Sequence, residues 1–401
     1  MTEVKQQGER LPLGALLALA MTGFICIVTE TLPAGLLPGI GTGLGISPSL
    51  AGQMVTVYAL GSLLAAIPLT IATQTWRRRR VLLLTIVGFL VFNSFTALSS
   101  NYWLTLVARF FAGVSAGLAW SLIAGYARRM VSPSLQGRAL AVAMVGTPVA
   151  LSLGVPLGTW LGGIMGWRMA FGVMSGLTLL LIAWVLIKVP DYPGQSSSQR
   201  KVLRQVLFTP GVRSVLGVVV TWMLAHNILY TYIAPFVATA GLAGDVDLVL
   251  LVFGVAALAG IWITGRLVDR HLRTSVLASL ATFAAVSIFF GFFSGSAAAI
   301  YAGVLIWGLT FGGAATLLQT ALADAAGEGA DVALSMNVVV WNSAIAAGGL
   351  MGGVLLDQWG AGSFPWVLML LLLVSLAIAS RAHVHGFPRG ERRHGQVVVG
   401  H

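Results

Sequence analysis

A single carboxylate, Glu30, stands alone in the apolar N-terminal part of the chain. It is the only formally charged residue between Arg10 and Arg77, and it falls inside an apolar run from Leu13 to Pro38. A charge near the centre of a bilayer costs about 2.5 kcal/mol or more, so such residues face a bundle interior or an aqueous path and bind protons, ions or substrate. Glu30 is therefore the first choice for a proton-binding group.

A basic residue in a later apolar run is a possible partner for this acid. Arg109 lies about 9 Å along a helix from Trp103, and Glu30 lies about 10 Å short of Leu37 at the end of its own run. The two residues thus fall at a similar depth, where an acid and a base could pair and switch with proton occupancy. The alternative is that both side chains extend to the outer membrane surface.

His226 and several uncharged polar residues complete the chemistry available in the apolar runs. The titration range of histidine suits proton transfer, although a purely structural histidine is the alternative. Uncharged hydrogen-bonding groups and aromatic rings suit sugars, nucleosides or neutral drugs in a central cavity, and some of them will instead join helices. The cavity candidates are Asn227, Tyr230, Tyr232, Gln319, Asn337 and Asn342.

Composition indicates which elements must position these groups. Hydrophobic residues make up 57% of the 401 residues, charged residues make up 9%, and the mean hydropathy is +0.91, which excludes an ordinary soluble domain. The apolar runs are long enough for helices that cross a bilayer and lack the alternation of a membrane barrel. We predict an all-α polytopic membrane protein with twelve transmembrane helices, over residues 13–37, 50–73, 81–98, 103–126, 139–165, 169–187, 215–238, 248–267, 276–293, 297–322, 332–356 and 364–378.

The basic residues define the expected orientation of these helices. Of 23 lysines and arginines, all but Arg109 and Arg168 fall near the chain ends or after the second, fourth, sixth and eighth spans. The positive-inside rule then places both termini in the cytoplasm, and the expected location is the bacterial cytoplasmic (inner) membrane. The net charge of +11 follows from this topology and requires no nucleic-acid partner.

The longest connection between spans predicts two halves. It is rich in proline, serine and basic residues, as linkers are. We expect an N-terminal six-helix half at residues 1–188, a cytoplasmic linker at 189–212, and a C-terminal six-helix half with a cytoplasmic tail at 213–401.

A shift of 195 residues relates the two halves. It maps Glu30 onto Ala225, the neighbour of His226, so both halves would present a polar group at a similar place in their first helices. Internal repeats of this kind are common in transporters. The same shift aligns glycine pairs, namely Gly113 and Gly117 with Gly308 and Gly312, and Gly154 and Gly158 with Gly349 and Gly353.

A ridge of glycines marks the fifth span. Gly154, Gly158, Gly162 and Gly166 recur at four-residue spacing, and small residues let helix backbones approach closely in lipid. The ridge either packs tightly against a neighbour or slides against it during a conformational cycle.

These motifs resemble those of the twelve-span drug:proton antiporter family of the major facilitator superfamily. Within that family, residues 30–38 and 230–236 are most similar to bacterial sugar (arabinose-type) and purine-ribonucleoside efflux permeases. The resemblance implies two rocking six-helix halves around a cavity lined by the first, fourth, seventh and tenth spans. The motifs are Arg109 with Gly113 and Gly117, the series Gly146, Pro148, Gly154, Pro156 and Gly158, and the run Gly166, Trp167, Arg168 and Phe171.

One family motif departs from its usual form. The acidic, glycine-containing loop expected after the second span is replaced by a run in which Gln74 holds the acidic position and four arginines, 77–80, follow. The second-half copy keeps Gly265, Asp269 and Arg270. The resemblance therefore implies a cytoplasmic gate in the second half, whereas the four arginines suit anchoring of the topology.

The function implied by the resemblance is proton-coupled export of a small molecule by alternating access. Glu30 would bind the proton, and Arg109 would modulate the pKa of Glu30. The alternatives are a proton-linked uptake symporter of the same fold, a non-transporting receptor and a membrane-embedded enzyme. No group of nucleophile, base or metal ligands supports the enzyme, because the remaining histidines lie in loops or the tail, at His271, His383, His385, His394 and His401.

The expected partners are few. They are the small-molecule substrate, protons and the lipid bilayer, and the family default is a monomer. No cofactor or metal is expected, and the single cysteine, Cys26, cannot form an internal disulfide.

Overall fold

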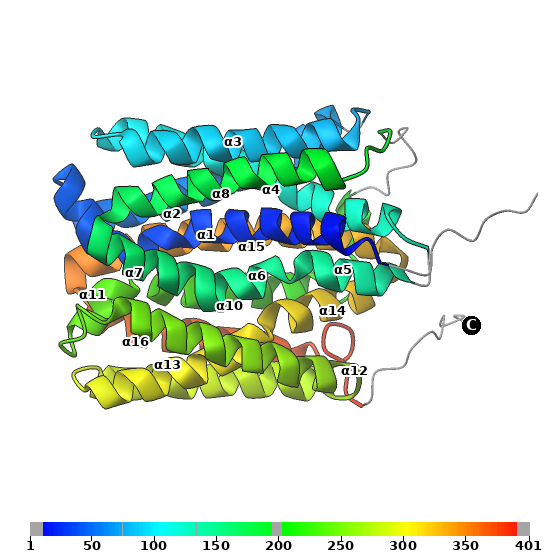
Figure 1. Cartoon of the computed structure of the whole chain (residues 1–401). Helices are drawn as coiled ribbons and strands as arrows, with labels where there is room; N and C mark the ends of the chain where they lie inside the picture. The colour runs from blue at the N-terminus through cyan, green and yellow to red at the C-terminus, as the bar shows by residue number, and fades with distance from the viewer. Residues whose placement is uncertain (1–10, 74, 133–134, 195–202, 391–401) are drawn as a thin grey trace, which may run out of the picture.

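The structure, a computed structural model, describes residues 11–73, 75–132, 135–194 and 203–390 as a bundle of helices (Figure 1). Twelve helices in this part are long and apolar enough to cross a membrane, which confirms the predicted fold class. The helices are α1 Leu13–Leu44, α2 Pro48–Ala72, α3 Arg78–Leu98, α4 Tyr102–Arg129, α5 Gln136–Met144, α6 Gly146–Val149, the π-helix η2 Ala150–Gly154, α7 Val155–Met165, α8 Trp167–Lys188, α9 Leu203–Leu207, α10 Val212–Thr231, α11 Ile233–Ala238, α12 Val246–Phe293, α13 Ala297–Gly312, α14 Ala314–Ala326, η3 Gly327–Gly329, α15 Ala330–Trp359, η4 Ala361–Ser363 and α16 Phe364–Arg381.

Several expected spans differ from the observed helices. The first span continues past Leu37 to Leu44. The fifth is interrupted by a π-helix just before Pro156, and the tenth breaks at Gly313. The eighth and ninth spans join in α12 across a kink at His271, so this histidine lies within a helix rather than in the expected loop. Breaks of this kind are tolerated in a membrane where neighbouring helices satisfy the backbone.

The two ends of the bundle differ in charge. The end where α1 begins, here called the arginine-rich end, carries Arg77, Arg129 and Arg273, and the end where α1 meets α2 is the arginine-poor end. At the arginine-poor end, the guanidinium of Arg168 donates to the carbonyls of Gly43 and Ser99.

Glycine contacts repeat between the two parts of the chain. A Cβ added at Gly113 or Gly117 of α4 would overlap the carbonyl oxygens of Tyr58 and Ser62 in α2. The corresponding glycines of α13, Gly308 and Gly312, meet the carbonyls of Phe253 and Ala257 in α12. Each glycine and each partner differs by 195 in number (113 to 308, 117 to 312, 58 to 253 and 62 to 257). The shift found in the sequence therefore also relates the packing.

The glycine ridge of the fifth span packs on α1. Cβ atoms added at Gly154, Gly158 and Gly162 would contact Val28, Leu32 and Leu36 respectively, which are also four residues apart. The fourth member, Gly166, has a positive φ of 88° and ends the helix instead. The ridge thus fixes α1, and the lone carboxylate on it, against α7.

Two corresponding pairs of helical segments, α2 with α15 and η2 with α12, bring the two halves together. Residues Ala59, Ile345 and Ala346 share a buried cluster between α2 and α15, and Gly254 of α12 packs against Leu151 and Ser152 of η2. The two contacts correspond at the same shift of 195, since 59 becomes 254 and 151 becomes 346. Figure 1 shows α1 and α15 between α3 on one edge of the bundle and α13 on the other.

Candidate functional site

Arg109 is completely buried and holds α1 and α2 through their backbones. Its Nη1 donates to the carbonyl of Thr29 at 2.6 Å and its Nη2 to the carbonyl of Glu30 at 3.3 Å. Its Nε donates to the carbonyl of Met54 at 3.2 Å. The guanidinium carbon lies 4.7 Å from the centre of the Tyr58 ring. One cation thus joins three helices at a single level of the bundle.

Pro33 explains why a donor is needed at this point of α1. A proline inside a helix has no N–H to donate to the carbonyl four residues earlier, and for Pro33 that carbonyl belongs to Thr29. The Arg109 guanidinium supplies the missing hydrogen bond. Pro38, the second proline inside α1, frees the carbonyl of Ala34 in the same way but lies beyond these contacts.

The Glu30 carboxylate lies among the groups that Arg109 organises, but the expected ion pair is not formed. Glu30 is 6% exposed, and in the described part of the chain no ion pair within 4.0 Å involves it; Arg109 contacts its carbonyl oxygen instead. The carboxylate is close enough to Arg109, Tyr58 and Tyr230 for its charge to act on each of them. Both side chains are buried, so neither extends to the surface as the alternative required.

Polar contacts around Glu30 connect four helices. The Asn93 side-chain amide of α3 donates to the Thr29 hydroxyl at 3.0 Å, and the Tyr58 hydroxyl of α2 donates to the carbonyl of Cys26 at 2.9 Å. Tyr230 of α10 lies beside Thr31. Buried groups that satisfy one another in this way rigidify the surroundings of a site.

His226 is enclosed by aromatic rings. Its imidazole stacks on Phe311 with ring centres 3.4 Å apart and planes 2° apart, and the rings of Tyr230, Trp307 and Phe253 lie 5.2, 5.3 and 5.8 Å away. These five residues, here called the His226 cluster, come from α10, α12 and α13. The sequence singled out His226 and Tyr230 but missed Phe253, Trp307 and Phe311, because a ring in an apolar run carries no signal that distinguishes a site from a core.

Three polar atoms of the His226 cluster are buried without a hydrogen-bond partner. They are His226 Nδ1, the Tyr230 hydroxyl and Trp307 Nε1. The Tyr230 hydroxyl lies next to Thr31 but outside hydrogen-bonding geometry, and the Thr31 hydroxyl donates to the carbonyl of Ile27. An unpaired buried polar group lowers stability by about 1–3 kcal/mol, so the three unpaired atoms of this cluster destabilise the fold.

The remaining polar residues divide between helix contacts and open faces. Asn227 and Asn342 donate to carbonyls one turn earlier in their own helices, and Asn227 also packs against Gly348 of α15. Asn337 is buried with its Oδ1 unpartnered. Gln319 is exposed in α14, within a candidate membrane span.

Tyr232 lies in a contact between the halves rather than in an open cavity. Its hydroxyl donates to the carbonyl of Gly349 at 2.7 Å and is also 3.2 Å from the carbonyl of Ser49. The side-chain amide of Gln53 donates to the Tyr232 hydroxyl and to the carbonyl of Gly349. Gly52 and Gly353 leave the space that the tyrosine ring occupies. We call Ser49, Gln53, Tyr232 and Gly349 the Tyr232 latch.

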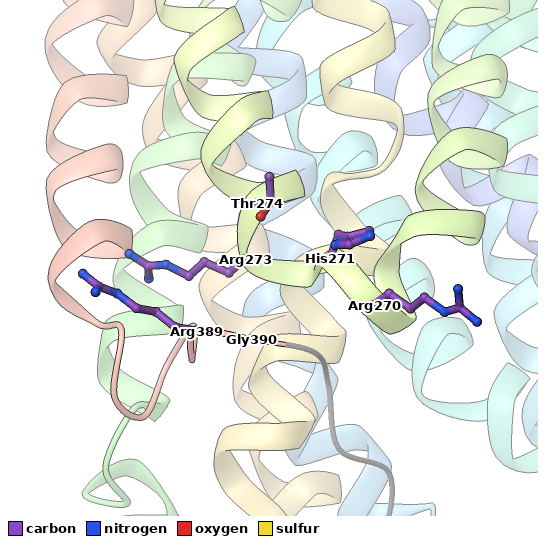
Figure 2. Close-up of a pocket in the computed structure, with 6 residues that line it drawn as sticks. All are labelled: Arg270, His271, Arg273, Thr274, Arg389 and Gly390. Carbon is purple, nitrogen blue, oxygen red and sulfur yellow. The ribbon is translucent and has the colours of Figure 1, made fainter.

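The second-half gate residues lie at the kink of α12. A cavity of about 440 Å³ lies there. Among the side chains that line it, Arg273 and Arg389 point to one side and Arg270 points to the other (Figure 2). Arg273 donates to the carbonyls of Ala379, Ser380 and Phe387, so it joins α12 to the chain after α16. The side chain of Asp269 and the whole of Gln74 lie outside the described residues, and Gly265 has open space around it.

The first-half loop has a partner that the sequence did not indicate. Arg77 Nε donates to Asp191 at 2.6 Å, the Arg79 amide donates to the same carboxylate, and the Arg78 amide donates to the carbonyl of Tyr192. An acid from the segment after α8 therefore binds the arginine run that lacks its own acid. Asp191 is distant in sequence from these arginines, so spacing alone could not reveal it.

No group of three or more metal-ligating side chains that could hold a metal occurs among the described residues. Twelve membrane-length helices in two related sets, with a buried acid and a buried base in the first set, are the architecture of a secondary membrane transporter. The chain belongs to the Major Facilitator Superfamily, whose family description it matches over residues 19–348.

The similar proteins are of the type that the sequence motifs indicated. The chain is 32% identical over 364 residues to the purine ribonucleoside efflux pump NepI of Escherichia coli (strain K12), which covers 88% of this chain and 90% of that protein. The NepI pumps of Shigella flexneri and Shigella sonnei (strain Ss046) match with the same identity and the same share of this chain. The predicted family is therefore confirmed, and the protein is a multi-pass membrane transporter.

Proposed function

We propose that the protein exports a small uncharged molecule in exchange for protons, with Glu30 as the proton-binding group. The observation that carries this proposal is the Glu30 carboxylate itself, 6% exposed in the centre of the bundle and without an ion pair in the described part of the chain. A carboxylate that is buried but not neutralised by a fixed partner is free to gain and lose a proton. The efflux activity of the relatives supports the direction of transport.

The arrangement of the halves supports alternating access. The Tyr232 latch joins α2 to α10 and α15 near the arginine-poor end. Farther along the same face of α2, Leu60, Leu64 and Ile67 are exposed, Leu64 by 60%. The spacing from Gln53 to these residues keeps them on one helix face. This face of α2 is therefore covered by α15 at one end only, as expected of a transporter closed at its arginine-poor end.

We place the protein in the bacterial inner membrane with both termini and the arginine-rich end in the cytoplasm, as the positive-inside rule requires. The conformation described would then be open toward the cytoplasm, ready to load substrate for export. The halves are residues 1–188 and 213–401, joined by the linker 189–212. Contacts of Asp191 hold the start of this linker to the first half, and Val206 of α9 packs on Gly329 in the second.

The substrate class follows from the uncharged lining and from the relatives. Tyr230, Gln319 and Asn337 offer hydrogen bonds without a fixed charge, which suits a nucleoside, a sugar or a neutral drug. A purine ribonucleoside is the first choice because the similar proteins are purine ribonucleoside efflux pumps.

Transport into proteoliposomes with an acidic interior tests the exchange. Outward proton flow drives uptake of substrate by an antiporter in either orientation. A symporter concentrates substrate only when the exterior is acidic, and a receptor moves no substrate. We expect acid-inside vesicles to accumulate inosine. Glu30→Gln should reduce this accumulation at least tenfold and remove its pH dependence, because the amide cannot exchange a proton.

Asp245→Asn is the matched control, because Asp245 is an exposed carboxylate outside the helices, and it should transport as the wild type does. Proton-driven accumulation with unchanged pH dependence in Glu30→Gln would show that another group binds the proton. Accumulation only from an acidic exterior would establish uptake instead of export.

A further inference from the structure

We propose that the His226 cluster is the binding site for the flat ring of the substrate, and that this ring takes the place of Phe311 on the face of His226. The ligand class is a planar, uncharged nitrogen heterocycle with hydrogen-bonding atoms along its edge, of which a purine base is an example. This inference rests on the proposed function and assigns residues to the base of the substrate.

The stacking geometry supports the exchange of one ring for another. The imidazole of His226 and the ring of Phe311 are 3.4 Å apart and parallel within 2°, which is the spacing of two stacked flat rings. Phe311 is only partly buried, whereas Trp307 behind it is fully buried and stacks on Phe283 at 5.9 Å. Phe311 is therefore the ring on the accessible side of His226.

The backbone beside Phe311 allows the ring to move. Helix α13 ends at Gly312, Gly313 interrupts the helical pattern, and α14 begins at Ala314. Two consecutive glycines at a helix break give the backbone more freedom than any other residues would. The partly buried Phe311 side chain would leave His226 by rotating about its own side-chain bonds, with adjustment of the backbone at this break.

The unpartnered polar atoms indicate what kind of ring would replace Phe311. His226 Nδ1, the Tyr230 hydroxyl and Trp307 Nε1 belong to side chains that are at least nine-tenths buried, and none has a partner. A phenyl ring cannot satisfy any of them. The edge of a nitrogen heterocycle offers both acceptors and donors, so a purine base stacked on the imidazole could pair with the Tyr230 hydroxyl and Trp307 Nε1 at its edge. His226 Nδ1 lies in the plane of the imidazole and cannot bond to a ring on its face.

The position of Tyr230 connects this ring site to the proton site. Its ring centre is 5.2 Å from that of His226, and its hydroxyl lies beside Thr31 of α1, within range of the Glu30 charge. A base bound in the His226 cluster would thus lie on the second-half side of the bundle, directly across from the carboxylate on the first half. Substrate and proton would act on the same tyrosine.

Equilibrium binding of radiolabelled inosine to the purified protein in nanodiscs, without a proton gradient, tests the ring site. Unlabelled hypoxanthine should compete and ribose should not, because the base carries the binding. Phe311→Leu, which keeps an apolar side chain without the ring, should bind inosine about two- to tenfold more tightly, since the bound base no longer displaces a stacked ring.

Variants of His226 separate stacking from hydrogen bonding. His226→Phe keeps a flat ring and removes the nitrogens, so inosine binding should stay within about twofold of the wild type, because a stacked base does not use those nitrogens. His226→Ala removes the ring and should weaken inosine binding about tenfold. Phe292→Ala is the matched control, because Phe292 forms a ring pair with Trp366 at 5.5 Å away from the cluster, and it should bind inosine as the wild type does. Thermal unfolding confirms that each variant is folded.

Each contrary result has a defined meaning. Unchanged or weaker binding in Phe311→Leu, or unchanged binding in folded His226→Ala, would overturn the ring site while leaving proton-driven export untouched. Failure of the wild type to bind inosine, adenosine or hypoxanthine would also overturn it, and export of a sugar or drug in acid-inside vesicles would still support the proposed function. Loss of proton coupling in Glu30→Gln with normal inosine binding would support both the ring site and the proposed function.

Discussion

Arg109 compensates for the hydrogen bond that Pro33 removes from α1. The guanidinium replaces the hydrogen bond that Pro33 cannot donate to Thr29, and it contacts the carbonyl, not the carboxylate, of Glu30. Its charge stays near the acid without fixing the acid in an ion pair. The proposed change in the protonation state of Glu30 would then take place while the backbone around it is held in place.

This arrangement predicts energetic coupling between Arg109 and Pro33. Arg109→Met leaves the carbonyl of Thr29 unpaired and should lower the free energy of unfolding by about 1–3 kcal/mol or more. Pro33→Ala restores an N–H that can donate to this carbonyl, so the double variant should recover part of the loss. Unfolding of the four proteins in detergent measures the coupling.

Pro38→Ala is the control for this cycle. Pro38 also lies inside α1, but Arg109 contacts none of the carbonyls that Pro38 frees, so its removal should not rescue Arg109→Met. Equal rescue by the two proline substitutions would mean that the gain comes from general helix propensity and that the Thr29 contact is not the cause.

At the scale of elements, the α2–α3 connection is held by a segment distant in sequence. Burial alone would raise the pKa of the Asp191 carboxyl, but hydrogen bonds from Arg77 and from the Arg79 amide, with the charges of both arginines, outweigh burial and lower this pKa below its usual range. A carboxyl with a lowered pKa in the folded state stabilises the fold above its unfolded pKa. That contribution is lost as the pH falls through the folded value.

The corresponding prediction concerns the pH dependence of stability. Asp191→Asn should lower the free energy of unfolding at neutral pH by less than about 1 kcal/mol, because Arg77 is largely exposed. The melting temperature should fall slightly as a result. The difference from the wild type should vanish in acid, where the native carboxyl is protonated too. Melting curves between neutral and acidic pH measure it, and a difference that persists unchanged in acid would contradict an ionic origin.

At the scale of the whole molecule, closure between the halves depends on few hydrogen bonds. In the described part of the chain, the hydrogen bonds between the halves are those of the Tyr232 latch. Other contacts between them are apolar or involve glycine, as for Gly254 against η2, and Tyr230 lies beside Thr31. Contacts of this kind can break and reform at low cost, which rocking between two states requires.

Tyr232→Phe should therefore shift the conformational equilibrium. It keeps the ring that fills the space beside Gly52 and Gly353 but removes the hydroxyl, and hydrogen bonds of this type contribute about 0.5–1.5 kcal/mol each. We expect the population open at the arginine-poor end to rise about tenfold. Spin labels on Leu50→Cys and Gln358→Cys in a Cys26→Ala background should report longer distances.

Tyr301→Phe serves as the control for the latch, because Tyr301 is a partly exposed tyrosine of α13 that forms no hydrogen bond of the latch. Its distance distribution should match that of the unmodified background. An unchanged distribution in Tyr232→Phe would show that the apolar contacts alone keep this end closed.

The relation between the halves could be derived from the sequence because it depends on residue type and spacing. Gly113, Gly117, Gly308 and Gly312 are needed wherever two backbones approach closely, so their common shift of 195 survives as a pattern along the chain. The contacts of these four glycines show the same shift in three dimensions. The membrane spans were predictable for a similar reason, since every span must be apolar over its whole length.

The twelve membrane spans and their one costly carboxylate, Glu30, follow from residue types read along the chain, because the bilayer penalises charge and rewards apolar length residue by residue. Only the tertiary structure decided which groups surround that carboxylate. Arg109 contacts carbonyls of α1, Asp191 binds Arg77, and Phe311 stacks on His226. Each contact joins residues far apart in the chain, and such contacts depend on how the helices pack, which no local pattern records.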